Sequence, residues 1–287
     1  MCRLYTFFAT DAAEVECGLV EAQNALLTQS RRDSSGRANG DGWGIAAYGN
    51  EIGAAPTVIR RARAASADLE FARDAERISS RAVVAHVRRA TIGTATLANT
   101  HPFTLGSWCF AHNGEVTAFD RIGPWMESET PDDLMSHRRG ETDSELLFLW
   151  ILGRLRSSGP AVSASLERLG VGLATCLAEL AARCREEGGS GPALNLVLTD
   201  GQRLLVSRWD YPLAWIWRRQ RHRCEICERC QCPRCATRSP RRPCDSSGPY
   251  RAVVVASEPL SAEPWDDFPN REVLILDTTF RPRFVST

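Results

Sequence analysis

The sequence contains no lysine, so all 35 of its basic residues are arginines. The guanidinium group stays protonated at any ordinary pH, which leaves the α-amino group as the only amine of the chain that titrates near neutrality. The 35 acidic residues balance the arginines to a formal net charge of +0. Charge therefore provides no overall attraction to nucleic acid or to an anionic membrane, and we expect neither as a partner.

Three further signals are missing. No stretch approaches the ~20 apolar residues that span a bilayer. The N-terminus lacks the basic start, apolar block and small-residue cleavage site of a secretory signal. No Gly-rich phosphate loop opens a predicted helix, so nucleotide binding has no support. We therefore expect a soluble, cytoplasmic protein.

Hydrophobic residues make up 43% of the chain and charged residues 24%, as in ordinary globular proteins. Strands are predicted near both ends of the chain and helices mainly between them, which favours an α+β layered fold over alternating βαβ units. We expect one domain over residues 2–287. The predicted elements are helices at 11–30, 143–156 and 171–186, strands at 81–87, 107–112, 251–257 and 271–277, and a hairpin turning at Asp200-Gly201.

Cys2 is the candidate nucleophile. Its thiol becomes N-terminal when Met1 is removed, which a small second residue permits. The α-amine of Cys2, with a reference pKa of about 7.7–8.0, is then an adjacent base near neutral pH. Taken alone, a Met-Cys start also fits a disordered terminus.

Three other polar segments follow predicted strands or begin a predicted helix. Asn113-Gly114 offers a side-chain amide and a backbone NH that can bind an oxyanion together, although such a pair is also an ordinary turn. The fork of Arg88 suits a carboxylate, with the Thr91 hydroxyl three residues on, although an arginine there can also be solvated. Asp143 can pair with an ammonium group or simply cap a helix.

Together and in this order, the segments resemble the class II glutamine amidotransferases of the N-terminal-nucleophile hydrolase superfamily. That family is marked by an N-terminal Cys, an H-x-R-x-A-T-x-G segment, a later HNG and a T/S-D-S/T-E segment. The matching residues are Cys2, then His86, Arg88, Ala90, Thr91 and Gly93, then His112-Asn113-Gly114, then Thr142-Asp143-Ser144-Glu145. DGWG (41–44), HPF (101–103) and, more weakly, SEPL (257–260) are further landmarks.

The resemblance implies a four-layer αββα sandwich with the cysteine at the start of the first strand. It implies that Cys2 is the nucleophile, that its α-amine is the base, and that Asn113 and Gly114 form the oxyanion hole. No cofactor takes part in such a reaction. The absence of lysine fits a mechanism in which the terminal amine is the base.

The resemblance also assigns the substrate contacts. Arg88 and Thr91 would hold the α-carboxylate of a glutamine, and Asp143 its α-amino group. The larger family members carry Thr-His-Gly where this chain has Ile92 in place of the histidine. The chain also carries no synthase or transferase segment, so a separate enzyme would accept any ammonia. It is closer to small stand-alone members such as the γ-glutamyl hydrolase of ergothioneine biosynthesis, and we expect hydrolysis of glutamine or a γ-glutamyl compound.

Six of the eleven cysteines crowd into positions 224–244, within a Cys/Arg-rich insertion at about 218–248. From Arg218 to Cys244 the insertion has nine arginines and two glutamates. Two C-x2-C knuckles, Cys224/Cys227 and Cys232/Cys235, supply the four thiolates preferred by structural zinc. An iron–sulfur cluster and a solvated segment without metal are the alternatives. Cysteines in a cytoplasmic chain indicate metal, catalysis or burial rather than disulfides.

Two other functions compete with the Cys2 hydrolase. In one, an internal cysteine such as Cys109 works with His86, His101 or His112 as its base, and the protein stays active with Met1 in place. In the other, the chain is a zinc-stabilised binding protein on an inactive hydrolase scaffold. The presence of all four catalytic segments argues against the second alternative.

Overall fold

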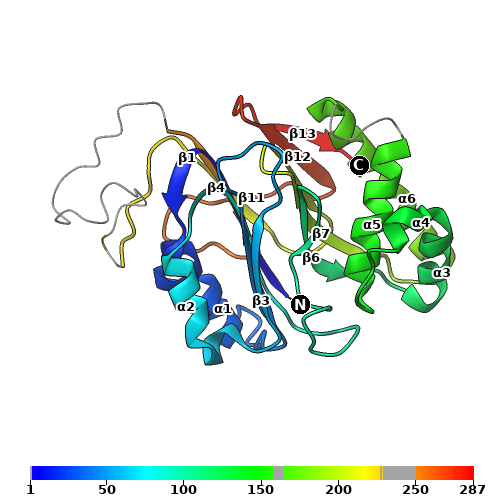
Figure 1. Ribbon diagram of the computed structural model, residues 1–287, viewed down its shortest axis with the longest axis horizontal. Coiled ribbons are helices and arrows are strands. Elements are labelled where there is room, and N and C mark those ends of the chain that lie inside the picture. The colour runs from blue at the N-terminus through cyan, green and yellow to red at the C-terminus, as the bar shows by residue number, and fades with distance from the viewer. Residues whose placement is uncertain (1, 158–163, 227, 229–249) are drawn as a thin grey trace.

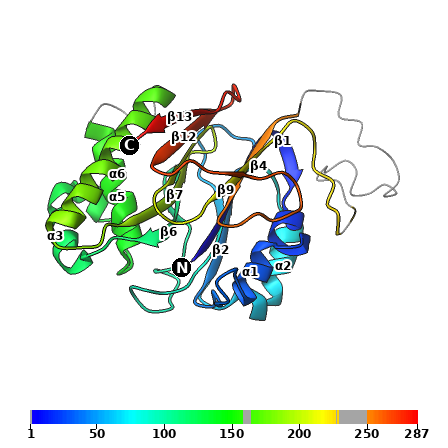
Figure 2. The same ribbon diagram turned by 180° about the vertical axis from the view of Figure 1, so that it is seen from behind.

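A computed structural model of the chain describes residues 2–157, 164–226, 228 and 250–287. Within them, two antiparallel sheets lie face to face, with helices on the outer side of each (Figures 1 and 2). This arrangement confirms the expected α+β fold and its αββα layers.

The first sheet has seven strands in the order β11-β9-β10-β1-β4-β2-β3. Its central strand β1 pairs with β10 on one side and β4 on the other. Both faces of β1 are buried, which explains its long apolar and aromatic run rather than an alternating pattern. The strands are β1 (Arg3–Glu14), β2 (Trp43–Ala47), β3 (Thr57–Arg61), β4 (Ser79–Val87), β9 (Ala214–Arg218), β10 (Ala252–Ala256) and β11 (Asp266–Asp267).

The second sheet has six strands in the order β13-β12-β8-β7-β6-β5. The predicted hairpin at Asp200-Gly201 joins β7 to β8, and Gly201 takes the positive φ that such a turn requires. The strands are β5 (Phe103–Leu105), β6 (Trp108–Glu115), β7 (Ala193–Thr199), β8 (Arg203–Arg208), β12 (Glu272–Asp277) and β13 (Arg283–Ser286).

The helices form the two outer layers (Figures 1 and 2). The first sheet is covered by the π-helical turn η1 (Cys17–Glu21), α1 (Leu26–Arg31), the short η2 (Ala65–Ala67) and α2 (Leu69–Glu76). The second is covered by α3 (Phe119–Glu129), α4 (Asp132–Met135), α5 (Asp143–Ser157) and α6 (Leu166–Glu186). A third apolar cluster, which includes Leu4, Val84, Cys109 and Val206, fills the space between the sheets.

The helices predicted at 143–156 and 171–186 are confirmed as α5 and part of α6. The helix predicted at 11–30 is wrong over its first part, because β1 continues through a bulge to Glu14 and pairs there with Ser79 and Ser80. Only η1 and α1 are helical in that range. Pairing with a neighbouring strand outweighs local helical preference at this point.

The strands β9 and β10 are adjacent antiparallel partners, joined by residues 219–251. The predicted Cys/Arg-rich insertion at 218–248 falls in this connection, and residues 227 and 229–249 lie outside the described part of the chain.

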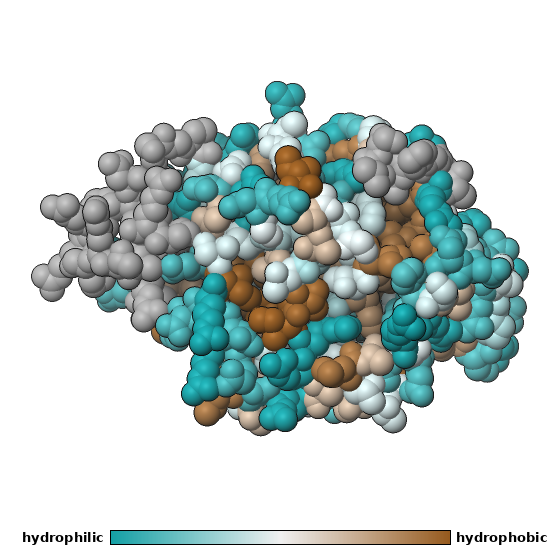
Figure 3. All heavy atoms as spheres, in the orientation of Figure 1, coloured by the Kyte–Doolittle hydropathy of each residue, from teal (hydrophilic) through white to brown (hydrophobic). Residues whose placement is uncertain are grey.

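Hydrophobic residues on the face seen in Figure 3 gather in separate groups bordered by hydrophilic ones, as on many globular proteins. Among the described residues, no helix combines the length and the apolar character needed to cross a membrane.

Candidate functional site

Cys2 lies directly before β1, the central strand of the first sheet, at the end of the chain marked N in Figures 1 and 2. Its Sγ donates to the carbonyl of Arg89 at 3.3 Å and accepts from the Arg89 NH at 3.2 Å. Burial raises the pKa of the Cys2 thiol, while the Arg89 NH and the charge of Arg88 lower it and the charge of Asp143 raises it. Residues from two distant segments, 88–89 and Asp143, therefore share one site with the thiol.

The backbone of Cys2 is held by its neighbour Arg3. The Arg3 Nη1 donates to the Cys2 carbonyl at 2.9 Å, its Nε lies 2.9 Å from Glu258 Oε1, and its Nη2 lies 2.9 Å from Asp33 Oδ2. Glu258 also accepts from Ser34. The sequence analysis assigned no role to Arg3, Asp33 or Glu258. Two features of the sequence could have indicated these roles: the charged residue directly after Cys2, and the SEPL landmark, which contains Glu258.

The ion pair between Arg3 and Asp33 makes the free energy of unfolding depend on pH. Burial opposes ionisation of Asp33, but hydrogen bonds from Ser35 and Arg37 and the charge of Arg3 lower its pKa to about 2. This folded-state pKa lies below the reference value of about 3.9, so the ionised carboxylate stabilises the fold above pH 4. That contribution, about 2 kcal/mol, is lost as the pH falls from about 4 to 2.

We expect Asp33→Asn to lower the free energy of unfolding by about 2 kcal/mol at pH 6 and by much less at pH 2. Urea unfolding at a series of pH values measures both curves. Asp120→Asn is the control, because the Asp120 side chain is 76% exposed and lies 3.9 Å from Arg121. If the difference in the free energy of unfolding between wild type and Asp33→Asn persisted unchanged to pH 2, ionised Asp33 would not be the stabilising group.

Arg88 follows β4 and is buried, which excludes the alternative of a solvated arginine. Its guanidinium donates to the carbonyls of Ile92, Gly93 and Thr94, so it shapes the loop after β4. These contacts hold the guanidinium against the loop. Thr91 lies on the same loop and is exposed.

The DGWG landmark lies against the backbone that follows β4. The Asp41 carboxylate accepts from the Ala90 NH at 2.8 Å. A Cβ on Gly44 would stand 2.2 Å from the His101 carbonyl, so only glycine permits the contact between the DGWG and HPF segments.

Asn113 and Gly114 are on β6, not in a turn. The Asn113 Nδ2 donates to Ser257 Oγ at 3.0 Å, and the same oxygen accepts from the Leu4 NH at 3.0 Å. Ser257, from the SEPL landmark, thus ties Asn113 to the strand that begins beside Cys2. A Cβ on Gly114 would lie 1.8 Å from the Ala193 carbonyl.

Asp143 begins α5 and is buried. Its Oδ2 accepts from the Val116 NH at 2.9 Å and its Oδ1 from the Ser144 NH at 2.7 Å. Thr142 Oγ1 also accepts from the Glu145 NH at the start of the helix, whereas the Glu145 carboxylate binds the backbone NH groups of Arg139 and Gly140. Asp143 therefore joins the helix to the end of β6.

The structure disfavours an internal Cys–His pair. Cys109 is fully buried between the sheets, and burial raises the pKa of its thiol. Burial also lowers the pKa of His86 to about 3 and the pKa values of His101 and His112 below their usual range. The His112 ring is engaged by Ser144 and by a backbone carbonyl. Cys109 has no exposed surface on which to meet a substrate.

Of the predicted zinc ligands, Cys224 is described and buried. Cys227, Cys232 and Cys235 lie outside the described residues. The described part of the candidate site thus brings together Cys2, Arg88, Asp143 and Asn113 with Gly114, and leaves Thr91 on the exposed loop beside them. A half-buried thiol that is influenced by an arginine and a carboxylate, with an amide donor tied to the same strand, is an arrangement suited to acyl transfer.

Comparison with known proteins identifies the family. The sequence matches the glutamine amidotransferases class-II over residues 19–279. It is 28% identical to the probable glutamine amidotransferase DUG3 of Saccharomyces cerevisiae over 229 residues, 73% of this chain and 64% of that protein. The chain thus spans less than two thirds of the yeast relative's length.

Two further proteins are similar over more of their length. The γ-glutamyl-hercynylcysteine sulfoxide hydrolase of Mycolicibacterium smegmatis is 28% identical over 265 residues, 89% of this chain and 87% of that one. A glutamine aminotransferase class-II domain protein from Silicibacter pomeroyi shares the fold with a TM-score of 0.61 and 21% identity, covering 99% of both chains. Because the family match spans residues 19–279, this chain belongs to the class II glutamine amidotransferases.

Proposed function

We propose that the protein hydrolyses the side-chain amide of glutamine or of a γ-glutamyl compound through a thioester on Cys2. The observation that carries the proposal is the link from Cys2 to Asn113. Ser257 Oγ binds both the Leu4 NH and the Asn113 amide, so an amide donor lies beside the strand that presents the thiol. Family membership supports an enzyme over an inactive binding scaffold.

In the proposed reaction, the Cys2 α-amine takes the thiol proton and Sγ attacks the δ-carbonyl of the glutamyl group. The oxyanion is bound by the Asn113 amide and the Gly114 NH. The leaving amine departs with the proton from the α-ammonium group, and the thioester remains. Water then attacks the thioester and releases glutamate, restoring the thiol.

The glutamyl end of the substrate fits the charges around the thiol. The positive charge of Arg88, which acts on the Cys2 thiol, is placed to pair with the α-carboxylate. Thr91, on the exposed loop, adds a hydroxyl to the same end. The Asp143 carboxylate offers its remaining lone pairs to the α-ammonium group. These contacts recognise only the glutamyl end of the substrate. Free glutamine and γ-glutamyl amides share that end, so both fit the site. The similarity to a γ-glutamyl hydrolase over 89% of this chain supports hydrolysis.

Intact mass before and after incubation with a diazo-ketone glutamine analogue tests the proposal. We expect loss of the Met1 mass and a single adduct on Cys2, because the analogue alkylates thiols poised in glutamine sites. Excess γ-glutamyl amide should slow the labelling. An adduct on another cysteine, or no adduct on a chain that has lost Met1 and hydrolyses no γ-glutamyl amide, would refute it.

A further inference from the structure

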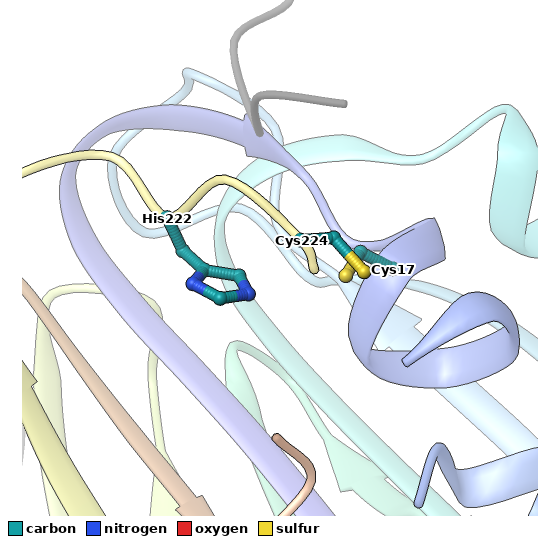
Figure 4. Close-up of side chains that lie close together, drawn as sticks. All are labelled: Cys17, His222 and Cys224. Carbon is teal, nitrogen blue, oxygen red and sulfur yellow. The ribbon is translucent and has the colours of Figure 1, made fainter. Parts of the chain in front are cut away.

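A second cluster of reactive side chains lies on the far side of the first sheet from the candidate site. Cys17 begins η1, and His222 and Cys224 follow β9. One ligand atom from each lies within 4.8 Å of the other two. All three side chains are buried, and Figure 4 shows the imidazole edge and the two sulfurs turned toward one another.

The imidazole of His222 is oriented by an acid. Its Nδ1 lies 3.1 Å from Glu263 Oε2, while its Nε2 is buried without a hydrogen-bond partner among the described residues. The carboxylate therefore accepts the Nδ1 proton and leaves the Nε2 lone pair for another partner. Metal-binding histidines commonly make such a bond to a carboxylate.

Glu263 is itself fixed in place. The Arg218 Nε donates to Glu263 Oε1 at 2.9 Å, and the Ser261 hydroxyl donates to Oε2 at 2.7 Å. The contact of this network with His222 resembles the outer sphere of a metal site, because it sets both the ring orientation and the tautomer.

We propose that Cys17, His222 and Cys224 bind a zinc ion through two thiolates and the His222 Nε2. In a tetrahedral site, with Zn–S near 2.3 Å and Zn–N near 2.0–2.1 Å, neighbouring ligand atoms stand about 3.5–3.8 Å apart. The present separations, within 4.8 Å, need only a small contraction. Soft thiolates with an imidazole select zinc over magnesium or calcium. A fourth donor completes the tetrahedron.

The site differs from the zinc site that the sequence predicted. Both use Cys224, but the described partners are Cys17, which lies more than 200 residues earlier in the chain, and His222. The metal would join η1, which follows β1, to the segment that leaves β9. Its role is structural, because two strands of the first sheet are tied together at the start of the Cys/Arg-rich connection.

Metal content of the full-length protein tests the proposal. Protein purified under reducing conditions and supplied with zinc is dialysed against zinc-free buffer, and bound zinc per chain is measured by mass spectrometry of the metal. We expect Cys17→Ala and His222→Ala each to lose one equivalent relative to wild type. Cys176→Ala is the matched control, because Cys176 is a buried cysteine on α6 outside the cluster.

A milder variant keeps the test valid if Cys17→Ala fails to fold. Glu263→Gln should fold and weaken zinc affinity by about 10–100-fold in competition with a chelator, because the tautomer is no longer fixed by a charge. Cobalt substitution should give thiolate-to-metal absorption that Cys17→Ala diminishes. Unchanged zinc content in both Cys17→Ala and His222→Ala, or a Cys17–Cys224 disulfide in the purified protein, would overturn the proposal. The readout is independent of amidase activity.

Discussion

The Cys2→Ala variant is expected to lose glutaminase and γ-glutamyl hydrolase activity by on the order of 10⁴-fold or more, because no thioester can form without the thiol. A coupled assay of glutamate released from γ-glutamyl amides measures the loss of activity. Cys176→Ala, with its substitution on α6, is expected to keep full activity. Residual activity of Cys2→Ala within tenfold of wild type would mean that another residue is the nucleophile.

A second variant separates the thiol from its base. Inserting glutamate between Met1 and Cys2 prevents removal of Met1 and converts the Cys2 amine into a peptide bond. The thiol remains, but the proposed base is gone, so we expect a decrease of about 10²–10⁴-fold, the range typical of general acid–base catalysis. Full activity in this variant, with Met1 verified by mass, would point to a side-chain base.

The surroundings of the Cys2 thiol indicate that blocking the α-amine causes a loss near the upper end of this range. The charged side chains that act on the Cys2 thiol are Arg88 and Asp143. An arginine cannot accept a proton at neutral pH, and the Asp143 carboxylate is already bonded to two backbone NH groups. Burial raises the pKa of the thiol, so an adjacent amine that titrates near neutrality makes the largest difference.

The fold was predictable where the signal is local. The apolar spacing of 143–156 and the Asp200-Gly201 turn predicted α5 and the β7–β8 hairpin from short stretches of sequence. The segment 11–30 failed because its first residues pair with Ser79 and Ser80 across a bulge. No feature within those twenty residues reveals a partner strand more than sixty residues away.

The same contrast between local and long-range features applies to the candidate site. Motif order located Cys2, Arg88, Asn113 and Asp143, but it assigned no role to the residues that hold them. Asp33, Glu258 and Ser257 act through contacts that join segments up to 255 residues apart. The same limit applies to Cys17 and His222, whose proximity arises from strand pairing rather than from a knuckle spacing. Positioning residues therefore emerge only from the folded chain.

Asn113→Ala is expected to lower kcat by about 10²–10³-fold while changing KM little, because an oxyanion donor acts on the transition state rather than on the bound substrate. The Asn113 Nδ2 carries two hydrogens, and one of them goes to Ser257 Oγ. The second is available to the developing oxyanion. Steady-state hydrolysis of a γ-glutamyl amide gives both constants.

Asn195 provides a matched control for this effect. It lies directly opposite Asn113 in the β6–β7 register and is equally buried, but its amide binds the carbonyls of Tyr211 and Pro212. Asn195→Ala should therefore reduce stability and leave kcat of the folded enzyme unchanged. Ser257→Ala should fall between the two, since it keeps the amide but removes the acceptor that orients it. Equal losses of kcat in Asn113→Ala and Asn195→Ala would mean that Asn113 acts only by supporting β6.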